Sequence, residues 1–191
     1  QPVLRNGQRR RRRIDRHLPG QPLRTGDIDW RAATAAAAPT LGPVLLPGDA
    51  LMALLSTSGT TGSPKGVPVP LRAMMAFASY MELAVDLRAE DVFWNIADPG
   101  WAYGLYYAVI GPLMLGHAIA LQEAGFSVQG SYALIADLGV TNLMGSPTAY
   151  RMLMAAGDDA AQAIRGQLRV VSSAGEPLNP EVIRWFAKVL D

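Results

Sequence analysis

The chain has 191 residues and a formal net charge of +1, and half of its residues are hydrophobic while 17% are charged. This is the composition of a globular domain. It contains no cysteine, which excludes disulfides and thiolate metal sites, and His17 and His117 lie too far apart in sequence to suggest an imidazole metal cluster. We therefore predict no metal site.

The basic residues are concentrated at the start of the chain. Residues 1–24 hold eight arginines and one acid, which leaves nine basic and fifteen acidic side chains in residues 25–191, a net charge of −6. An acidic body does not indicate a nucleic-acid surface, and we expect no nucleic-acid partner.

Residues 1–24 show no periodicity, and the run Arg9–Arg13 would repel itself in a compact state. We interpret this segment as a disordered tail or as an artefact of a shifted reading frame in GC-rich DNA. A basic arm for nucleic acid or a targeting signal is a further alternative. No signal peptide is visible, because no apolar run follows the arginines. Residues 25–49 are transitional, with a short helix predicted over residues 30–38 and a proline- and glycine-rich loop after it.

From residue 50 onward, short apolar runs alternate with helical patterns. We predict a buried strand over 50–55, a polar loop over 56–66, a short strand over 67–69 and a helix over 71–83. Further strands are predicted at 91–95, 118–121, 140–144 and 168–172, and further helices at 103–115, 128–138, from Ser146-Pro147 onward and at 181–190. Ser146-Pro147 and Asn179-Pro180 are typical helix starts, and Gly139 is typical of a left-handed helix end.

This alternation predicts an α/β fold, a layered and largely parallel sheet with flanking helices. The apolar stretch over 102–121 is long enough to cross a bilayer, but Gly111-Pro112 near its middle and a turn at Gly116 favour a buried helix, a turn and a strand. We therefore predict no membrane span.

The segment from Ser56 to Gly66 is rich in hydroxyl side chains and glycine, and it contains one lysine, Lys65. Glycines let the backbone approach a ligand closely, turned N–H groups bind anions, and hydroxyls and a lysine add donors for phosphate oxygens. The spacing fits neither a Walker A loop nor a dinucleotide fingerprint. A flexible linker is the alternative, but Pro64, Lys65 and the flanking apolar strand argue against it. The sequence thus predicts a polyphosphate-binding loop.

The ten residues Thr57–Gly66 are similar to the phosphate-loop motif of the adenylate-forming, or AMP-binding, superfamily, which includes acyl-CoA synthetases, luciferases and peptide-synthetase adenylation domains. Residues 91–101 (DVFWNIADPGW) resemble a segment of acetyl- and medium-chain acyl-CoA synthetases. Residues 146–151 (SPTAYR) and 173–180 (SAGEPLNP) follow in the order of that family. The resemblance covers residues 50–191, which would be part of the AMP-binding, large N-terminal domain.

The resemblance implies a role for three groups of residues. The ATP phosphate loop would comprise Thr57, Ser58, Gly59, Thr60, Thr61, Gly62, Ser63 and Lys65, and the adenine site Gly175, Glu176 and Pro177. The acyl and CoA pocket would comprise Trp101, Ala102, Tyr103, Gly145 and Ala174. Glu176 in a plain solvated turn and Trp101 as a core aromatic are the alternatives. No catalytic residue is assigned, because the catalytic lysine of the family lies in a C-terminal domain outside this chain.

The implied activity is that of a cytoplasmic ligase of fatty acid metabolism. It would use ATP, Mg²⁺ and CoA to activate a short- or medium-chain carboxylate through an acyl-adenylate. An adenylate-forming enzyme with a carrier-protein acceptor and a non-catalytic nucleotide- or RNA-binding remnant are the alternatives. We expect the isolated 191-residue chain to be inactive, and to aggregate or bind the dye ANS.

Overall fold

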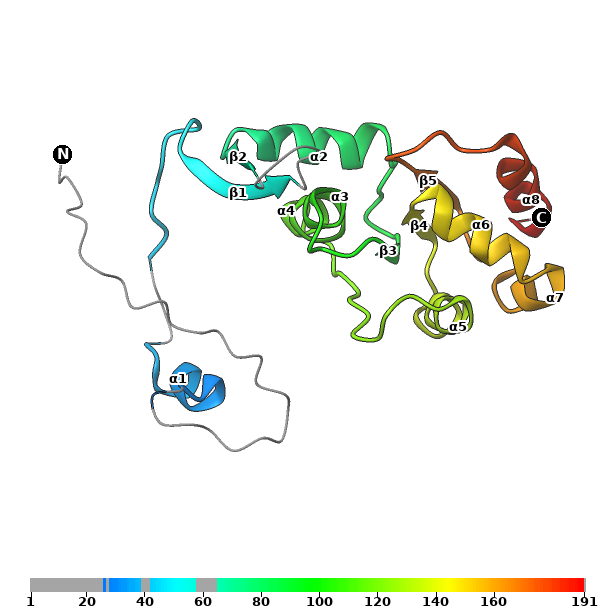
Figure 1. Ribbon diagram of the computed structural model, residues 1–191, viewed down its shortest axis with the longest axis horizontal. Coiled ribbons are helices and arrows are strands. Elements are labelled where there is room, and N and C mark those ends of the chain that lie inside the picture. The colour runs from blue at the N-terminus through cyan, green and yellow to red at the C-terminus, as the bar shows by residue number, and fades with distance from the viewer. Residues whose placement is uncertain (1–25, 27, 39–41, 58–64, 191) are drawn as a thin grey trace. The chain divides into compact units, whose positions relative to one another are not determined.

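The computed structural model describes residues 26, 28–38, 42–57 and 65–190, which fall into two units that divide between Leu45 and Leu46. Residues 1–24 lie outside the described residues, so the interpretations of that segment stay predictions. The first unit contains helix α1 (Trp30–Ala36), where we predicted a short helix (Figure 1). The side chain of Asp29 caps it by accepting a 2.7 Å hydrogen bond from the Ala32 amide.

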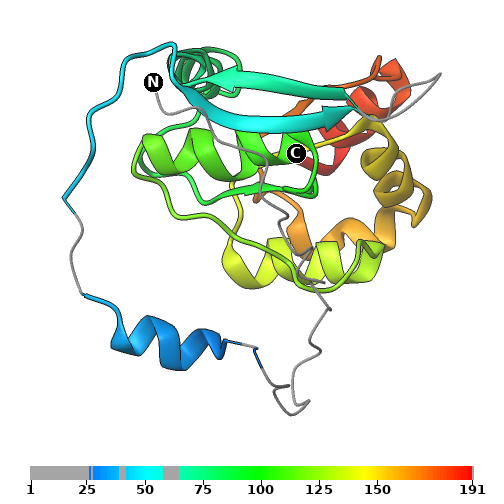
Figure 2. The same cartoon turned by 60° about the vertical axis from the view of Figure 1, so that its left-hand side comes forward.

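The second unit begins with an antiparallel hairpin of β1 (Leu51–Thr57) and β2 (Lys65–Pro70), in which Thr57 pairs with Lys65 (Figure 2). Both predicted strands are present, but the expected burial of the first is wrong. Leu51 and Leu54 are 60% and 64% exposed. The reason is that β1 pairs with β2 alone among the described strands, so much of this two-stranded ribbon has no cover.

Helix α2 (Ala73–Leu83) packs against a helical segment over residues 102–114. That segment consists of α3 (Ala102–Gly104), the π-helical η1 (Leu105–Ile110) and α4 (Gly111–Met114), which matches the predicted helix over 103–115. Phe77 stacks on Tyr106 with ring centroids 4.3 Å apart. The prediction of a strand over 118–121 is wrong. Among the described strands, β3 pairs with β4 alone, so residues 118–121 do not join the sheet.

A three-stranded parallel sheet holds the core, in the order β3 (Phe93–Asn95), β4 (Asn142–Gly145), β5 (Val170–Ser173). Around it lie α5 (Val128–Leu138), α6 (Pro147–Ala155), α7 (Asp158–Ala161), η2 (Gln162–Ile164) and α8 (Pro180–Leu190). The larger cluster of buried side chains includes Trp94, Ile135, Leu143, Leu153 and Val182. The predicted α/β class, with a parallel sheet and flanking helices, is confirmed.

The predicted helix ends are also confirmed. The Ser146 hydroxyl oxygen accepts from the Ala149 amide at 3.2 Å, and the Asn179 side-chain oxygen accepts from the Glu181 amide at 3.0 Å. Gly139 closes α5 in the left-handed conformation with φ 67°. None of the described helices has the length and apolar character needed to cross a bilayer.

At the amino ends of the parallel strands, Arg169 holds two aspartates. Its guanidinium donates to both carboxylate oxygens of Asp91, with Nε 3.0 Å from Oδ1, and to the Asp86 carboxylate at 2.7 Å. Thr141 donates to Asp91 at 2.8 Å. Burial alone would raise the pKa of Asp91, whose side chain is 1% exposed, but these hydrogen bonds outweigh it and hold the pKa well below its ordinary value. We call Arg169, Asp86, Asp91 and Thr141 the amino-end clamp.

Candidate functional site at the carboxyl edge of the parallel sheet

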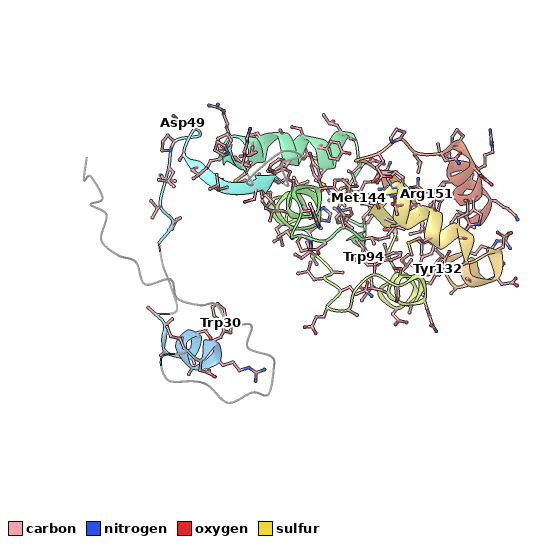
Figure 3. All side chains as sticks on the ribbon, viewed as in Figure 1. Trp30, Asp49, Trp94, Tyr132, Met144 and Arg151 are labelled. Atoms are coloured by element: carbon pink, nitrogen blue, oxygen red, sulfur yellow. The ribbon has the colours of Figure 1, made fainter. Side chains whose placement is uncertain are left out.

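The carboxyl ends of β3, β4 and β5 share one edge of the sheet, which is where open α/β folds bind ligands. Three segments leave this edge: residues 96–101 after β3, Ser146 at the start of α6 after β4, and residues 174–179 after β5. Figure 3 labels Trp94 on β3, Met144 on β4 and Arg151 on α6 as guides to this region. We call the region formed by residues 96–101, Ser146 and residues 174–179 the carboxyl edge.

Tyr150 ties β4 and β5 together at this edge. Its hydroxyl lies 2.7 Å from the Ser172 carbonyl oxygen, to which it donates, and 3.2 Å from that of Leu143. Complete burial raises its pKa well above the ordinary value of 10, so it stays a neutral donor. Gly145 ends β4 directly beside this ring, and a Cβ there would lie 3.0 Å from Tyr150 Cε1. A side chain at residue 145 would therefore crowd the Tyr150 ring.

Tyr103 reaches the same place from α3. Its hydroxyl lies against the backbone of Ala174 without completing a hydrogen bond within the described residues, and burial raises its pKa well above 10. It also lies near Tyr150. The structure thus brings together Tyr103, Gly145 and Ala174, three of the five residues predicted for the acyl and CoA pocket.

The other two predicted pocket residues, Trp101 and Ala102, lie on the exposed side of the start of α3. Trp101 is 69% exposed, so the alternative that it is a core aromatic is wrong. The turn before it is fixed, because the Asp98 carboxylate accepts a 2.7 Å hydrogen bond from the Gly100 amide. Trp101 and Ala102 are therefore held at the surface next to Tyr103.

Gly104 allows that turn to pack against the helix, a role that was not predicted from the sequence. A Cβ at this position would lie 2.1 Å from the Asp98 carbonyl oxygen and 2.8 Å from the Pro99 nitrogen. No side chain fits, since both contacts are with backbone. The available signal was a glycine within an apolar helical pattern, which is typical of a close backbone approach.

The predicted phosphate loop is described only at its two ends. Thr57 is the last residue of β1 and Lys65 is the first of β2, and they face each other in the ladder. Ser58, Gly59, Thr60, Thr61, Gly62 and Ser63 lie outside the described residues. The phosphate-binding role of the loop stays a prediction.

The predicted adenine segment forms a turn between β5 and α8. Gly175 has φ 93°, a left-handed conformation that favours glycine. The carboxylate of Glu176 accepts from the Thr148 hydroxyl at 3.2 Å and from the Arg151 guanidinium at 3.4 Å. Glu176 is therefore not a free surface carboxylate. Its partners on α6 were not predicted, because a side-chain contact across 25 residues has no signal in the sequence.

A hollow of about 640 Å³ opens beside this edge, between the turn after β3, residues 120–126 and the start of α6. Asn95 lines it and is 4% exposed. Its Oδ1 accepts from the Ala97 amide at 2.9 Å, while its Nδ2 has no partner within the described residues. None of the predicted site residues lines this hollow. Asn95 was also missed, although a polar residue at the end of an apolar strand was visible in the sequence.

The described residues contain no group of three or more histidine, aspartate or glutamate side chains that could hold a metal ion. The carboxyl edge offers instead the buried Tyr150 beside the partly buried Tyr103, an exposed glycine turn, and an arginine–threonine–glutamate group. An edge of this kind is where open α/β folds bind ligands.

Comparison with known proteins defines the class. The family model described as "AMP-binding enzyme" matches residues 5–191, and the chain therefore belongs to that family.

Among individual proteins, a crystal structure of Brucella canis acyl-CoA synthetase is 62% identical to this chain, with a TM-score of 0.85 over 91% of the chain and 32% of that protein. The acetyl-coenzyme A synthetase of Bacillus subtilis is 45% identical over 136 residues, which are 71% of the chain and 24% of that protein. That of Pseudoalteromonas translucida is 36% identical over 182 residues, 89% of the chain and 28% of that protein. The chain thus spans about a quarter to a third of the length of these relatives.

Proposed function

We propose that this chain is the nucleotide- and acid-binding part of a longer acyl-CoA synthetase. The observation that carries the proposal is the meeting of Tyr103, Gly145 and Ala174 beside the Gly175–Pro177 turn at the carboxyl edge. The relatives named above support the same activity through their printed names.

The proposed reaction has two steps. A carboxylate oxygen of the acid attacks the α-phosphorus of ATP, the bond from that phosphorus to the β-phosphate oxygen breaks, and pyrophosphate leaves. The thiolate of CoA then attacks the acyl carbon, the bond to the AMP oxygen breaks, and AMP leaves with the thioester formed. Positioning and charge neutralisation dominate catalysis of the first step.

The residues of this chain would bind and orient the reactants. The loop after Thr57 would hold the β- and γ-phosphates together with Lys65, and Gly175, Glu176 and Pro177 would line the adenine. Tyr103 and Ala174 would form one wall of the acyl pocket, Trp101 and Ala102 would extend it, and Gly145 would lie on its CoA side. Mg²⁺ would enter with the nucleotide, because it is bound through substrate phosphates and one or two carboxylates.

We propose further that the acid is short- or medium-chain and that the enzyme is cytoplasmic. CoA is the favoured thiol, supported by the names of the relatives, and a carrier-protein thiol is the alternative acceptor. The RNA-binding alternative has no support from the described residues.

The test is the exchange of labelled pyrophosphate into ATP by the longer protein, with acetate, butyrate, octanoate or no acid, followed by thioester formation with CoA or with a phosphopantetheinyl carrier protein. We expect exchange that requires one of these acids, and a thioester with CoA. A folded, pure protein without acid-dependent exchange would contradict the proposal. Transfer only to the carrier protein would select the alternative acceptor.

A further inference from the structure

Three side chains from two elements meet beside the proposed adenine turn. Arg151 donates to the Thr148 hydroxyl oxygen at 2.7 Å, and that hydroxyl in turn donates to the Glu176 carboxylate at 3.2 Å. Arg151 also lies 3.4 Å from Glu176 as an ion pair. Thr148 and Arg151 stand one turn apart on α6, so both reach the turn after β5 from the same face of the helix.

The direction of the hydrogen bonds orients the carboxylate. A threonine hydroxyl can accept one hydrogen bond and donate another at the same time, which lets it connect the guanidinium to the carboxylate. The Glu176 carboxylate is thereby held toward α6. Without these partners it would be a negative charge free to turn toward a nucleotide bound at Gly175.

We propose that Arg151 and Thr148 are positioning residues of the nucleotide site, which hold and neutralise the Glu176 carboxylate so that the adenine turn accepts a polyanionic nucleotide. This inference rests on the proposed function, since it concerns ATP bound at that turn. Neither residue was assigned a role from the sequence.

A stability role alone does not account for this group. The side chains of Arg151 and Glu176 are 45% and 50% exposed, and ion pairs this exposed contribute little to folding. The pair between Arg88 and Asp86 is similarly exposed, at 52% and 50%, but lies at the amino end of the sheet, away from the proposed nucleotide. It provides a control for the loss of an exposed ion pair, in which Asp86 keeps Arg169 as a second partner.

The experiment measures KM for ATP, KM for the acid and kcat in the longer protein. For Arg151→Met we expect KM for ATP to rise about fivefold, because an uncompensated carboxylate beside the adenine turn then repels the negatively charged nucleotide. We expect kcat to stay within about twofold, because no reacting atom is touched. KM for the acid should not change, and the defect should shrink at high salt, which screens the repulsion.

Charge rescue separates this role from simple loss of structure. The double variant Arg151→Met/Glu176→Gln should recover most of the loss, because the uncompensated charge is gone. Arg151→Lys should stay near the wild type, since it keeps the positive charge. Thr148→Ser should also stay near the wild type, and Thr148→Val should raise KM for ATP by about twofold, because the hydrogen bonds from Arg151 and to Glu176 are both lost. Arg88→Met should change none of the three constants.

An unchanged KM for ATP in Arg151→Met, or a double variant no better than the single one, would overturn the inference. The inference would also be overturned if Arg151→Met lowered the melting temperature, lowered kcat and raised both KM values by similar factors. That result would show a purely structural role. A wild-type protein without acid-dependent pyrophosphate exchange would instead overturn the proposed function, and the two failures are thus distinguishable.

Discussion

The two ends of the parallel sheet are built differently. At the amino end, the clamp of Arg169, Asp86, Asp91 and Thr141 surrounds a carboxylate that is almost fully buried and joins three segments of chain. At the carboxyl edge, Tyr150 is buried and hydrogen-bonded, but Arg151 and Glu176 are half-exposed. The Asn95 Nδ2 and the Tyr103 hydroxyl there have no partner within the described residues. The amino end pairs a buried charge, whereas the carboxyl edge leaves two neutral polar groups unpaired, although the Oδ1 of Asn142 at the amino end also has no partner within the described residues.

This difference separates stability from recognition. A buried charge that loses its partner is costly, so the amino end should respond to substitution by unfolding. Groups without an internal partner are available to a ligand, so substitutions at the carboxyl edge should weaken ligand binding.

Removal of Arg169 should have the largest effect on folding. Arg169→Met leaves Asp91 buried and uncompensated, and we expect the free energy of unfolding to fall by about 3–5 kcal/mol. Urea unfolding followed by tryptophan fluorescence measures this. Arg88→Met, which breaks only an exposed pair, is the control and should stay within about 0.5 kcal/mol of the wild type. Equal losses in the two variants would contradict the clamp.

Gly104→Ala should destabilise the protein by about 3 kcal/mol, because its Cβ clashes with the backbone of the turn over residues 98–101 rather than with a side chain that could move. Gly125→Ala is the matched control, since a Cβ there meets no atom within 4 Å. The same urea titration should show little change for it. If Gly104→Ala is as stable as Gly125→Ala, then the turn does not rest on the helix as described.

Acid should weaken the amino end. The pKa of Asp91 is lower in the folded than in the unfolded state, so the unfolded chain takes up the proton first as pH falls below the ordinary value of 3.8. The contribution of Asp91 is therefore fully present well above pH 4 and is lost progressively below it. Urea midpoints between pH 7 and pH 3 measure the loss, which should be steeper in the wild type than in Arg169→Met. Parallel curves for the two proteins would exclude Asp91 as the source.

A larger side chain at Ala174 should affect substrate choice more than folding. Ala174→Leu fills space beside Tyr103, and we expect kcat/KM for octanoate to fall about tenfold or more relative to that for acetate, because a pocket discriminates by roughly that factor per methylene. Competing acids in one assay give the ratio directly. An unchanged ratio would remove Ala174 from the acyl pocket.

The features that depend only on neighbouring residues could be predicted from the sequence. Ser146 with Pro147, Asn179 with Pro180 and Gly139 mark helix ends by hydrogen bonds and backbone conformations that involve only neighbouring residues. Family resemblance also pointed to Tyr103, Gly145 and Ala174, which the fold brings together. These features do not depend on what a distant segment contributes.

The remaining features depend on contacts between distant segments. The exposure of Leu54 could not be predicted, because an apolar strand looks the same whether or not another layer covers it. The wrong strand over 118–121 has the same origin, since a strand needs a partner that the sequence does not identify. Arg169 and Asp91 are 78 residues apart, and their pairing is visible only in three dimensions.

Hydrogen–deuterium exchange of the longer protein, with and without a non-hydrolysable acyl-adenylate analogue, tests the division between the two ends most directly. We predict that the analogue protects the peptides over residues 98–103 and 174–177 and leaves those over 85–91 and 141–142 unchanged. Protection at the amino end with none at 174–177 would contradict the assignment of recognition to the carboxyl edge.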